Sequence, residues 1–306
     1  MNTIALKANV KKELWEFHKV LLWLPVVITS LILLMILVQY VALEQHQADN
    51  IMQALTHLSN LNAEEFNFDK IQEVSFGVSS GLFVPFLVIA GVVQFYYFTS
   101  CLFDERRDLS VYFWRSLPVS DATTIGVKLF TGALVIPAIF MLAASALLFI
   151  LLIVALIVTV VLSVGSDISL WHIWGSLPIL SNITKVWISL LPYTLWLLPL
   201  YAWVMLASMF AGKAPFLWAV IPVVLLVIIE SMFGHMFHFF SPVIAPALLN
   251  YFAIDNNLIQ QNAMQLQDVS LLPFSVLTDK VSLIGLVISA VLLYGVYWLR
   301  TNRSHG

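Results

Sequence analysis

The sequence predicts an all-α integral membrane protein, and three observations support this fold class. Of the 306 residues, 61% are hydrophobic and only 10% are charged, whereas soluble globular proteins are about a quarter charged. The apolar residues gather in runs of about twenty or more, the length at which a helix crosses about 30 Å of hydrocarbon. Lys and Arg residues fall mainly in alternate connections between these runs. We therefore expect a single transmembrane domain over residues 1–306.

Apolar runs bounded by charged or turn-forming residues predict six transmembrane helices. The third run is long enough to be one tilted helix that contains Pro137, or two closely joined passes. Because no polar turn divides it, we count it as one helix. The expected spans are 21–41, 76–102, 125–163, 187–210, 216–240 and 281–299.

The positions of Lys and Arg predict the side of the membrane on which each connection lies. With the amino terminus in the cytoplasm, eleven of the 14 Lys and Arg residues fall on the cytoplasmic side. Dividing the third run into two passes would move Lys213, Arg300 and Arg303 to the outside. We therefore expect six spans with both termini cytoplasmic. The cytoplasmic cations are then Lys7, Lys11, Lys12, Lys19, Arg106, Arg107, Arg115, Lys128, Lys213, Arg300 and Arg303.

The segment before the first span has the pattern of an amphipathic helix. Its apolar residues recur every three or four positions, and its lysines mostly occupy other faces. This predicts an elbow helix over 4–19 that lies in the membrane interface, where the lysines can meet anionic lipids. The alternative is a simple start to the first span. The apolar positions are Leu6, Val10, Leu14, Phe17 and Leu21.

Residues 103–121 form a charged and aromatic connection between the second and third spans. Leu109, Phe113 and Leu117 recur at every fourth position, Pro118 ends that helical pattern, and Ser120 or Asp121 can cap the next helix. We expect either a short cytoplasmic coupling helix that a partner grips through its aromatic and charged side chains, or a solvated connector. The candidate coupling residues are Asp104, Glu105, Arg106, Arg107, Asp108, Phe113, Trp114, Arg115 and Pro118.

Glu230 carries a charge inside the predicted fifth span, where an unpaired carboxylate is costly. His235 and His238 follow it near the predicted outer boundary. The three side chains are a candidate polar cluster on a substrate pathway, with a scaffold role as the alternative. Their spacing matches no standard zinc motif, so we expect no metal site here.

Two stretches resemble a known family. The run Asp104-Glu105-Arg106-Arg107-Asp108, followed by the residues from Phe113 to Asp121 (FWRSLPVSD), is similar to the cytoplasmic coupling region of ABC-2 type transporter permeases. The stretch KELWEFH, from Lys12 to His18, is similar to the elbow helix before the first span in those permeases. The sharp motifs cover about thirty residues, and the six-span architecture agrees over the whole chain.

The resemblance implies a membrane subunit of an ATP-driven exporter in a bacterial inner (plasma) membrane. It implies that this chain has no catalytic residues of its own, and that two copies of a cytosolic ABC ATPase bind ATP and Mg²⁺. It also implies a second permease, with a homodimer as the default, and contact with membrane lipids but not with nucleic acid. The sequence has no G-x-x-x-x-G-K-[ST] loop for ATP phosphates. The alternative is a polytopic membrane protein outside transport, either an intramembrane enzyme or an assembly or signalling factor.

Overall fold

The computed structural model describes residues 3–60, 68–108, 120–166, 168–177, 179–237, 243–253 and 274–302. Within these ranges every regular element is helical and no strand occurs. The elements are α1 (Thr3–Glu16), α2 (His18–Val41), α3 (Gln45–Asn60), α4 (Phe68–Ser100), α5 (Phe103–Arg107), α7 (Asp121–Phe130), the π-helical turn η1 (Thr131–Val135), α8 (Ile136–Gly165), α9 (Trp171–Ser176), α10 (Ile179–Phe210), α11 (Pro215–Phe237), α12 (Ile244–Phe252), α14 (Phe274–Lys280) and α15 (Leu283–Asn302).

The described ranges contain six helical runs that are long and apolar enough to cross a membrane, as expected for a multi-pass helical membrane protein. Several runs extend beyond the apolar windows seen in the sequence, because a helix can continue into water while hydropathy marks only its membrane part. The helix α10, for example, begins at Ile179 rather than at residue 187. The six runs are His18–Val41, Gly77–Arg107, Asp121–Gly165, Ile173–Phe210, Pro215–Phe233 and Leu283–Asn302.

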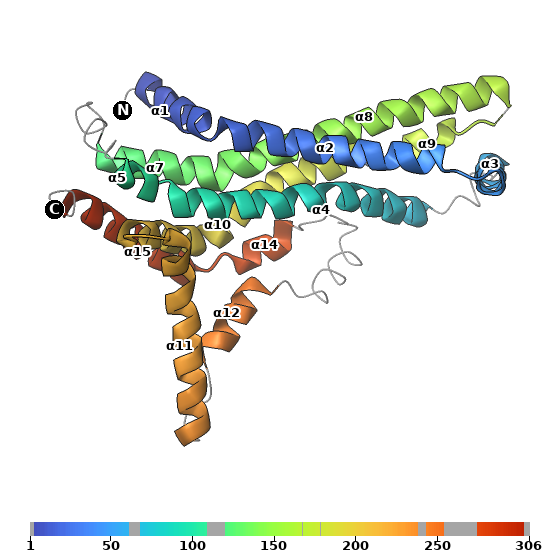
Figure 1. Ribbon diagram of the computed structural model, residues 1–306. Coiled ribbons are helices and arrows are strands. Elements are labelled where there is room, and N and C mark those ends of the chain that lie inside the picture. The colour runs from blue at the N-terminus through green and yellow to red at the C-terminus, as the bar shows by residue number, and fades with distance from the viewer. Residues whose placement is uncertain are drawn as a thin grey trace.

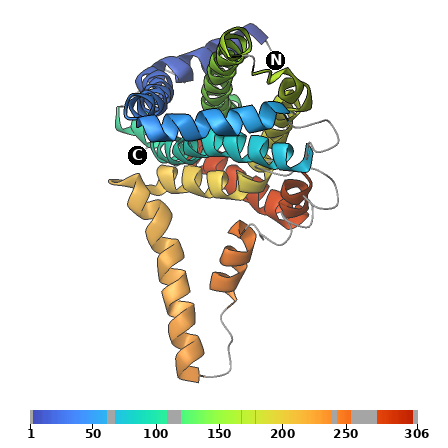
Figure 2. The same cartoon turned by 90° about the vertical axis from the view of Figure 1, so that its right-hand side faces the viewer.

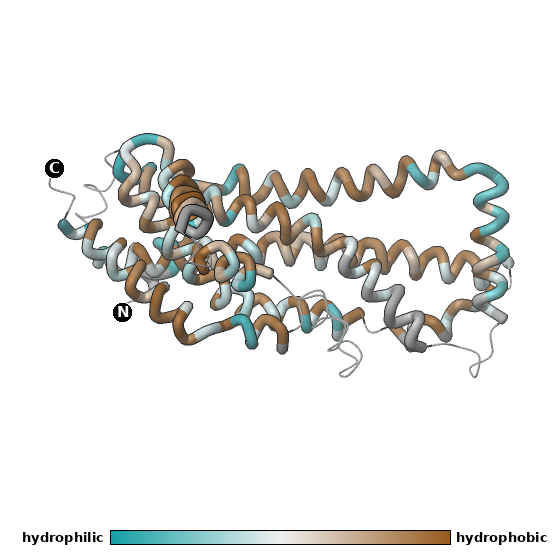
Figure 3. The backbone as a smooth tube through the Cα atoms, turned by 90° about the horizontal axis from the view of Figure 1, so that it is seen from below, coloured by the Kyte–Doolittle hydropathy of each residue, from teal (hydrophilic) through white to brown (hydrophobic). Residues whose placement is uncertain are grey.

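Five of these runs lie side by side in an elongated bundle that has α10 near its centre (Figure 1). α10 packs against α15, α4 and α11, and α4 packs against α8. Large side chains such as Phe86, Phe140 and Met205 are completely enclosed at these contacts. Figure 3 shows apolar residues along the long helices and hydrophilic residues gathered toward the two ends of the bundle. The bundle therefore has the polarity expected of a structure whose middle faces lipid.

The third predicted span is one continuous helical run from Asp121 to Gly165. Ser120 is its N-cap, and the Ser120 side chain accepts a hydrogen bond from the backbone N–H of Thr123 at 3.2 Å. At about 1.5 Å per residue the run is about 68 Å long, roughly twice the hydrocarbon thickness. A large part of it must therefore extend beyond the hydrocarbon.

The π-helical turn in this run is stabilised by a side chain from α4. Pro137 has no N–H group, so the carbonyl groups of Gly132 and Ala133 lose the donor that an ordinary residue would supply. The Gln94 amide donates to both, at 2.9 Å to Gly132 and 3.4 Å to Ala133. At the same crossing the Phe98 ring lies so close to Gly132 that a Cβ at this position would clash with it.

α11 departs from the common direction of the bundle. Figures 1 and 2 show that it projects away from the other long helices, with α12 beside it. The direction changes in a short turn after α10, where Ala214 adopts a left-handed φ of 52°. Only 6% of the most apolar 18 residues of α11 are buried. In this conformation α11 has a membrane-like composition but packs on the bundle mainly through its base.

Replacement of Gln94 by Leu should destabilise the fold by about 1–3 kcal/mol, because it leaves buried carbonyl groups without a donor. Thermal unfolding of the purified protein in detergent, followed by tryptophan fluorescence, measures this loss. Gln53→Leu on exposed α3 is the matched control. Substitution of Pro137 by Ala restores an N–H, so Gln94→Leu should be milder in that background. An equal loss of stability in both backgrounds would contradict the role of Gln94 as the donor that replaces the N–H group missing at Pro137.

Candidate functional site

Charged side chains from distant parts of the sequence meet at the end of the bundle where both labelled termini lie (Figure 1). We call this region the terminal end. α1, α5, the beginning of α7 and the end of α15 come together there, beside the end of α10. The predicted coupling segment begins at this point with α5.

Four of the charged side chains at the terminal end are almost completely buried. Glu13, Glu105, Lys128 and Arg300 are only 2%, 3%, 1% and 4% exposed. They come from α1, α5, α7 and α15, respectively. A buried charge is costly unless it is paired and hydrogen-bonded, so the packing of these four helices depends on how the charges pair.

Glu105 lies at the centre of the pairing. Its Oε1 is 3.1 Å from Lys128 Nζ and 3.3 Å from Lys12 Nζ, and its Oε2 is 3.0 Å from Arg300 Nη1. Lys128 Nζ also lies 2.9 Å from Glu13 Oε1. One carboxylate thus connects α5 to α1, α7 and α15 through charged contacts.

Asp121 completes the arrangement, which we call the ion network. Its Oδ1 accepts a hydrogen bond from Arg300 Nε at 2.8 Å, and Tyr97 donates to Glu13 Oε2 at 2.9 Å. Counted over the described side chains, three carboxylates face three cations. Its members are Lys12, Glu13, Glu105, Asp121, Lys128 and Arg300.

Glu16 lies next to the ion network on α1. Partial burial raises the pKa of its carboxyl group; Lys128 opposes this shift, and the carboxylate of Glu13 adds to it. The charges of Lys128 and Glu13 therefore act on the end of α1.

Arg106 holds α5 against the end of α10. Its guanidinium group donates to the backbone oxygens of Met209 at 2.6 Å and Ser208 at 3.3 Å, and also to that of Ala211. The backbone N–H of Phe103 donates to Ser208 Oγ at 3.0 Å. A cation at a helix C-terminus satisfies carbonyl groups that have no partner within the helix and also opposes the helix dipole. α5 is thereby bonded to α10 as well as to the ion network.

The candidate coupling residues divide into inward-facing and surface groups. Glu105 and Arg106 turn inward to the contacts just described. Arg107 and Asp108 are exposed, and Asp104 is intermediate, with its Oδ1 3.3 Å from Arg107 Nη2. The remaining candidates lie outside the described residues, namely Phe113, Trp114, Arg115 and Pro118.

Glu230 lies outside the ion network, and its described partners are backbone N–H groups. Its carboxylate accepts hydrogen bonds from the backbone N–H groups of Val243, Ile244 and Ala245, the shortest at 2.6 Å. These groups begin α12, where a carboxylate satisfies free donors and matches the helix dipole. Glu230 therefore ties α12 to α11. The predicted cluster with His235 and His238 falls outside the part of the chain whose side chains are described.

The ion network was only partly visible in the sequence. We expected Glu105 as a partner contact and Glu230 as the notable charge within a span, but Lys128 also lies inside the predicted third span. A lysine in an apolar run predicts a buried partner of opposite charge. The position of Lys128 was therefore the signal in the sequence that could have indicated the ion network. Nothing in the linear sequence indicated that Glu13, 115 residues away, would be that partner.

Replacement of Lys128 by Met should destabilise the protein by about 3–5 kcal/mol, because Glu13 and Glu105 lose a shared buried cation. Lys19→Met, at an exposed position, is the matched control and should be nearly neutral. Thermal unfolding in detergent compares the two. The double variant Lys128→Met with Glu13→Leu removes one charge of each sign, so it should be more stable than Lys128→Met alone. A double variant with additive losses would show that the two charges do not interact.

No protein-family model, no curated protein and no solved structure matches the chain significantly.

Proposed function

We propose that this chain is the membrane-spanning permease subunit of an ABC-2 type exporter, powered by a separate ATP-binding subunit. The observation that carries the proposal is the bonding of α5 to the bundle. Through Glu105 and Arg106, this short helix connects to α1, α7, α10 and α15. It also begins the stretch whose sequence resembles the coupling region of such permeases.

The bonding gives a physical route for transmitting force. A partner that displaces residues 104–121 also displaces α5, and buried charges resist separation because each would lose its partner. Neighbouring helices are then expected to move with α5 as a unit. ATP binding by the partner would shift the permease between inward-open and outward-open states, since the two states differ in affinity for the nucleotide-bound partner.

The inward and surface residues have different proposed roles. Glu105 and Arg106 transmit displacement to the bundle. Asp108, together with Phe113, Trp114 and Arg115, contacts the ATPase. Aromatic and arginine side chains are the residue types most often found at the centres of protein interfaces. The chain itself carries out no covalent chemistry on this proposal.

The proposed complex contains two copies of this chain as a homodimer and two cytosolic ABC ATPases that hold ATP and Mg²⁺. We place it in a bacterial inner membrane with both termini cytoplasmic. The orientation is supported by the cations of α1, α5, α7 and the end of α15, which gather at the terminal end and favour the cytoplasmic side.

Copurification from the native host tests the partner. Tagged wild-type chain should bring down an ATPase with a phosphate-binding loop, whereas Phe113→Ala with Trp114→Ala should lose it while remaining inserted in the membrane. Arg106→Gln should keep the ATPase bound but reduce the transport-coupled part of ATP hydrolysis, because the contact surface remains while the attachment to α10 weakens. Trp15→Ala, at an exposed aromatic position on α1, is the control. Recovery of no ATPase with wild-type chain would refute the proposal and favour a membrane protein outside transport.

Cysteine labelling tests the orientation. In a Cys101→Ala background, Asp108→Cys should react with a membrane-impermeant maleimide only after the cytoplasmic face is opened. Asp49→Cys on α3, at the opposite end of the bundle, should react from outside in intact cells. Labelling of residue 108 in intact cells would place the coupling segment on the wrong side for an ATPase.

A further inference from the structure

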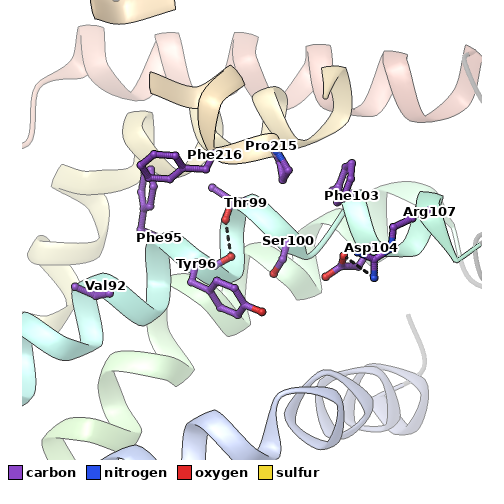
Figure 4. Close-up of a pocket in the computed structure, with 10 residues that line it drawn as sticks. All are labelled: Val92, Phe95, Tyr96, Thr99, Ser100, Phe103, Asp104, Arg107, Pro215 and Phe216. Carbon is purple, nitrogen blue, oxygen red and sulfur yellow. Dashed lines mark hydrogen bonds and ion pairs between the residues drawn. The ribbon is translucent and has the colours of Figure 1, made fainter. Parts of the chain in front are cut away.

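A groove of about 450 Å³ lies at the terminal end, outside the ion network. α4 and α5 form one wall, and the first residues of α11 form the other (Figure 4). The Phe95 and Phe216 rings meet edge to face across it, with centroids 5.7 Å apart. Val92, Tyr96 and Phe216 are each more than half exposed. The volume is within the range of about 300–1,000 Å³ found for small-molecule pockets.

The chemical character of the lining changes along the groove. Val92, Phe95 and Phe216 make one part apolar, whereas Asp104 and Arg107 form an ion pair at the other end, as Figure 4 shows. α4 ends at Ser100, and α5 begins at Phe103 after a short turn. The apolar part of the groove therefore lies along α4 and its charged end lies on α5, an order that suits a molecule with a charged head and an apolar tail.

The charged end of the groove carries more negative than positive charge among the side chains of Asp104, Arg107 and Asp108. Arg107 Nη2 lies 3.3 Å from Asp104, and Arg107 Nε lies 3.0 Å from Asp108. Counted over these described side chains, one guanidinium faces two carboxylates. The Arg107 side chain is 61% exposed and that of Asp104 is 28% exposed, so a bound molecule can reach both.

We propose that this groove binds a zwitterionic phospholipid with a primary ammonium group, that is, a phosphatidylethanolamine. The lipid phosphate meets Arg107, whose planar fork suits phosphate oxygens. The lipid ammonium meets Asp104, and one acyl chain lies along Phe95 and Phe216 toward Val92. An anionic phospholipid has no ammonium group to meet Asp104, so it binds less well.

A lipid bound in this groove would affect how α11 is attached to the bundle. The groove lies on the surface of α4 and α5 and against the base of α11, where the chain leaves the bundle. A lipid held there joins α5 to α11, in addition to the contacts that Arg106 makes with the end of α10. The occupancy of the groove therefore affects how firmly α11 is held. The inference does not depend on an ATPase partner, because the purified chain alone can test it.

Native mass spectrometry of the full chain, delipidated in detergent, measures the preference directly. Phosphatidylethanolamine and phosphatidylglycerol with the same acyl chains are added in equal amounts, with free phosphoethanolamine in a separate arm. Phosphatidylethanolamine adducts should exceed phosphatidylglycerol adducts by about two- to fivefold, the range expected for partly exposed ion pairs. Free phosphoethanolamine should give no adduct, because it lacks the acyl chain.

Variants assign the preference to the groove. Arg107→Gln should lower phosphatidylethanolamine binding by a similar factor, and Asp104→Asn should shift the preference toward phosphatidylglycerol by removing the carboxylate that needs a cation. Val92→Trp should block the apolar part without touching either charge. Asp49→Asn, at an exposed position on α3, is the control for the loss of a carboxylate and should leave the ratio unchanged.

A photoactivatable phosphatidylethanolamine with its reactive group on the acyl chain gives a second readout. Crosslinks should fall on the peptides that contain Val92 or Phe216. Three results would overturn the inference: phosphatidylglycerol bound as well as phosphatidylethanolamine by the wild-type chain, groove variants that behave like the controls, or crosslinks located away from these peptides. A free phosphoethanolamine adduct would also overturn it, since the site would then recognise a soluble ligand.

Discussion

The pairing of Glu105 with Lys128 and Arg300 is the interaction on which the terminal end of the bundle depends. Each of these side chains is almost completely removed from solvent. In a low-dielectric interior an ion is tolerated only where its partner is held close. The pairing therefore constrains more than two residues at a time. It sets the relative positions of α5, α7 and α15, and Glu13 extends the same constraint to α1.

Two kinds of attachment meet at α5. Glu105 joins it to the ion network, whereas Arg106 joins it to the backbone at the end of α10. α10 then continues into the turn that leads to α11, whose length is largely exposed. The tightly bonded part of the molecule thus borders directly on the candidate span that has the smallest buried share. The proposed lipid groove lies beside this boundary.

Side chains also complete backbone hydrogen bonding at two irregular points. Gln94 serves the carbonyl groups left without a donor by Pro137, and Glu230 serves the N–H groups that begin α12. An apolar surrounding offers little water for such groups, so an irregular helix requires a side chain to replace the missing partner. In the sequence, Pro137 was noted inside the long third run. Gln94 could not be assigned to it, because the two are brought together only by the crossing of α4 with the third long helix.

The sequence by itself determined the helical membrane class, the approximate positions of the six apolar runs and a helix cap at Ser120 or Asp121. These features depend on local properties, namely the transfer of about twenty neighbouring residues into hydrocarbon and the hydrogen bonding of one turn. The tertiary structure alone decided which charges pair, that Glu105 and Arg106 turn inward, and that α11 leaves the bundle. Glu105 and Arg300 are 195 residues apart in the chain. Their contact depends on the packing of whole helices against one another, and no local pattern encodes that packing.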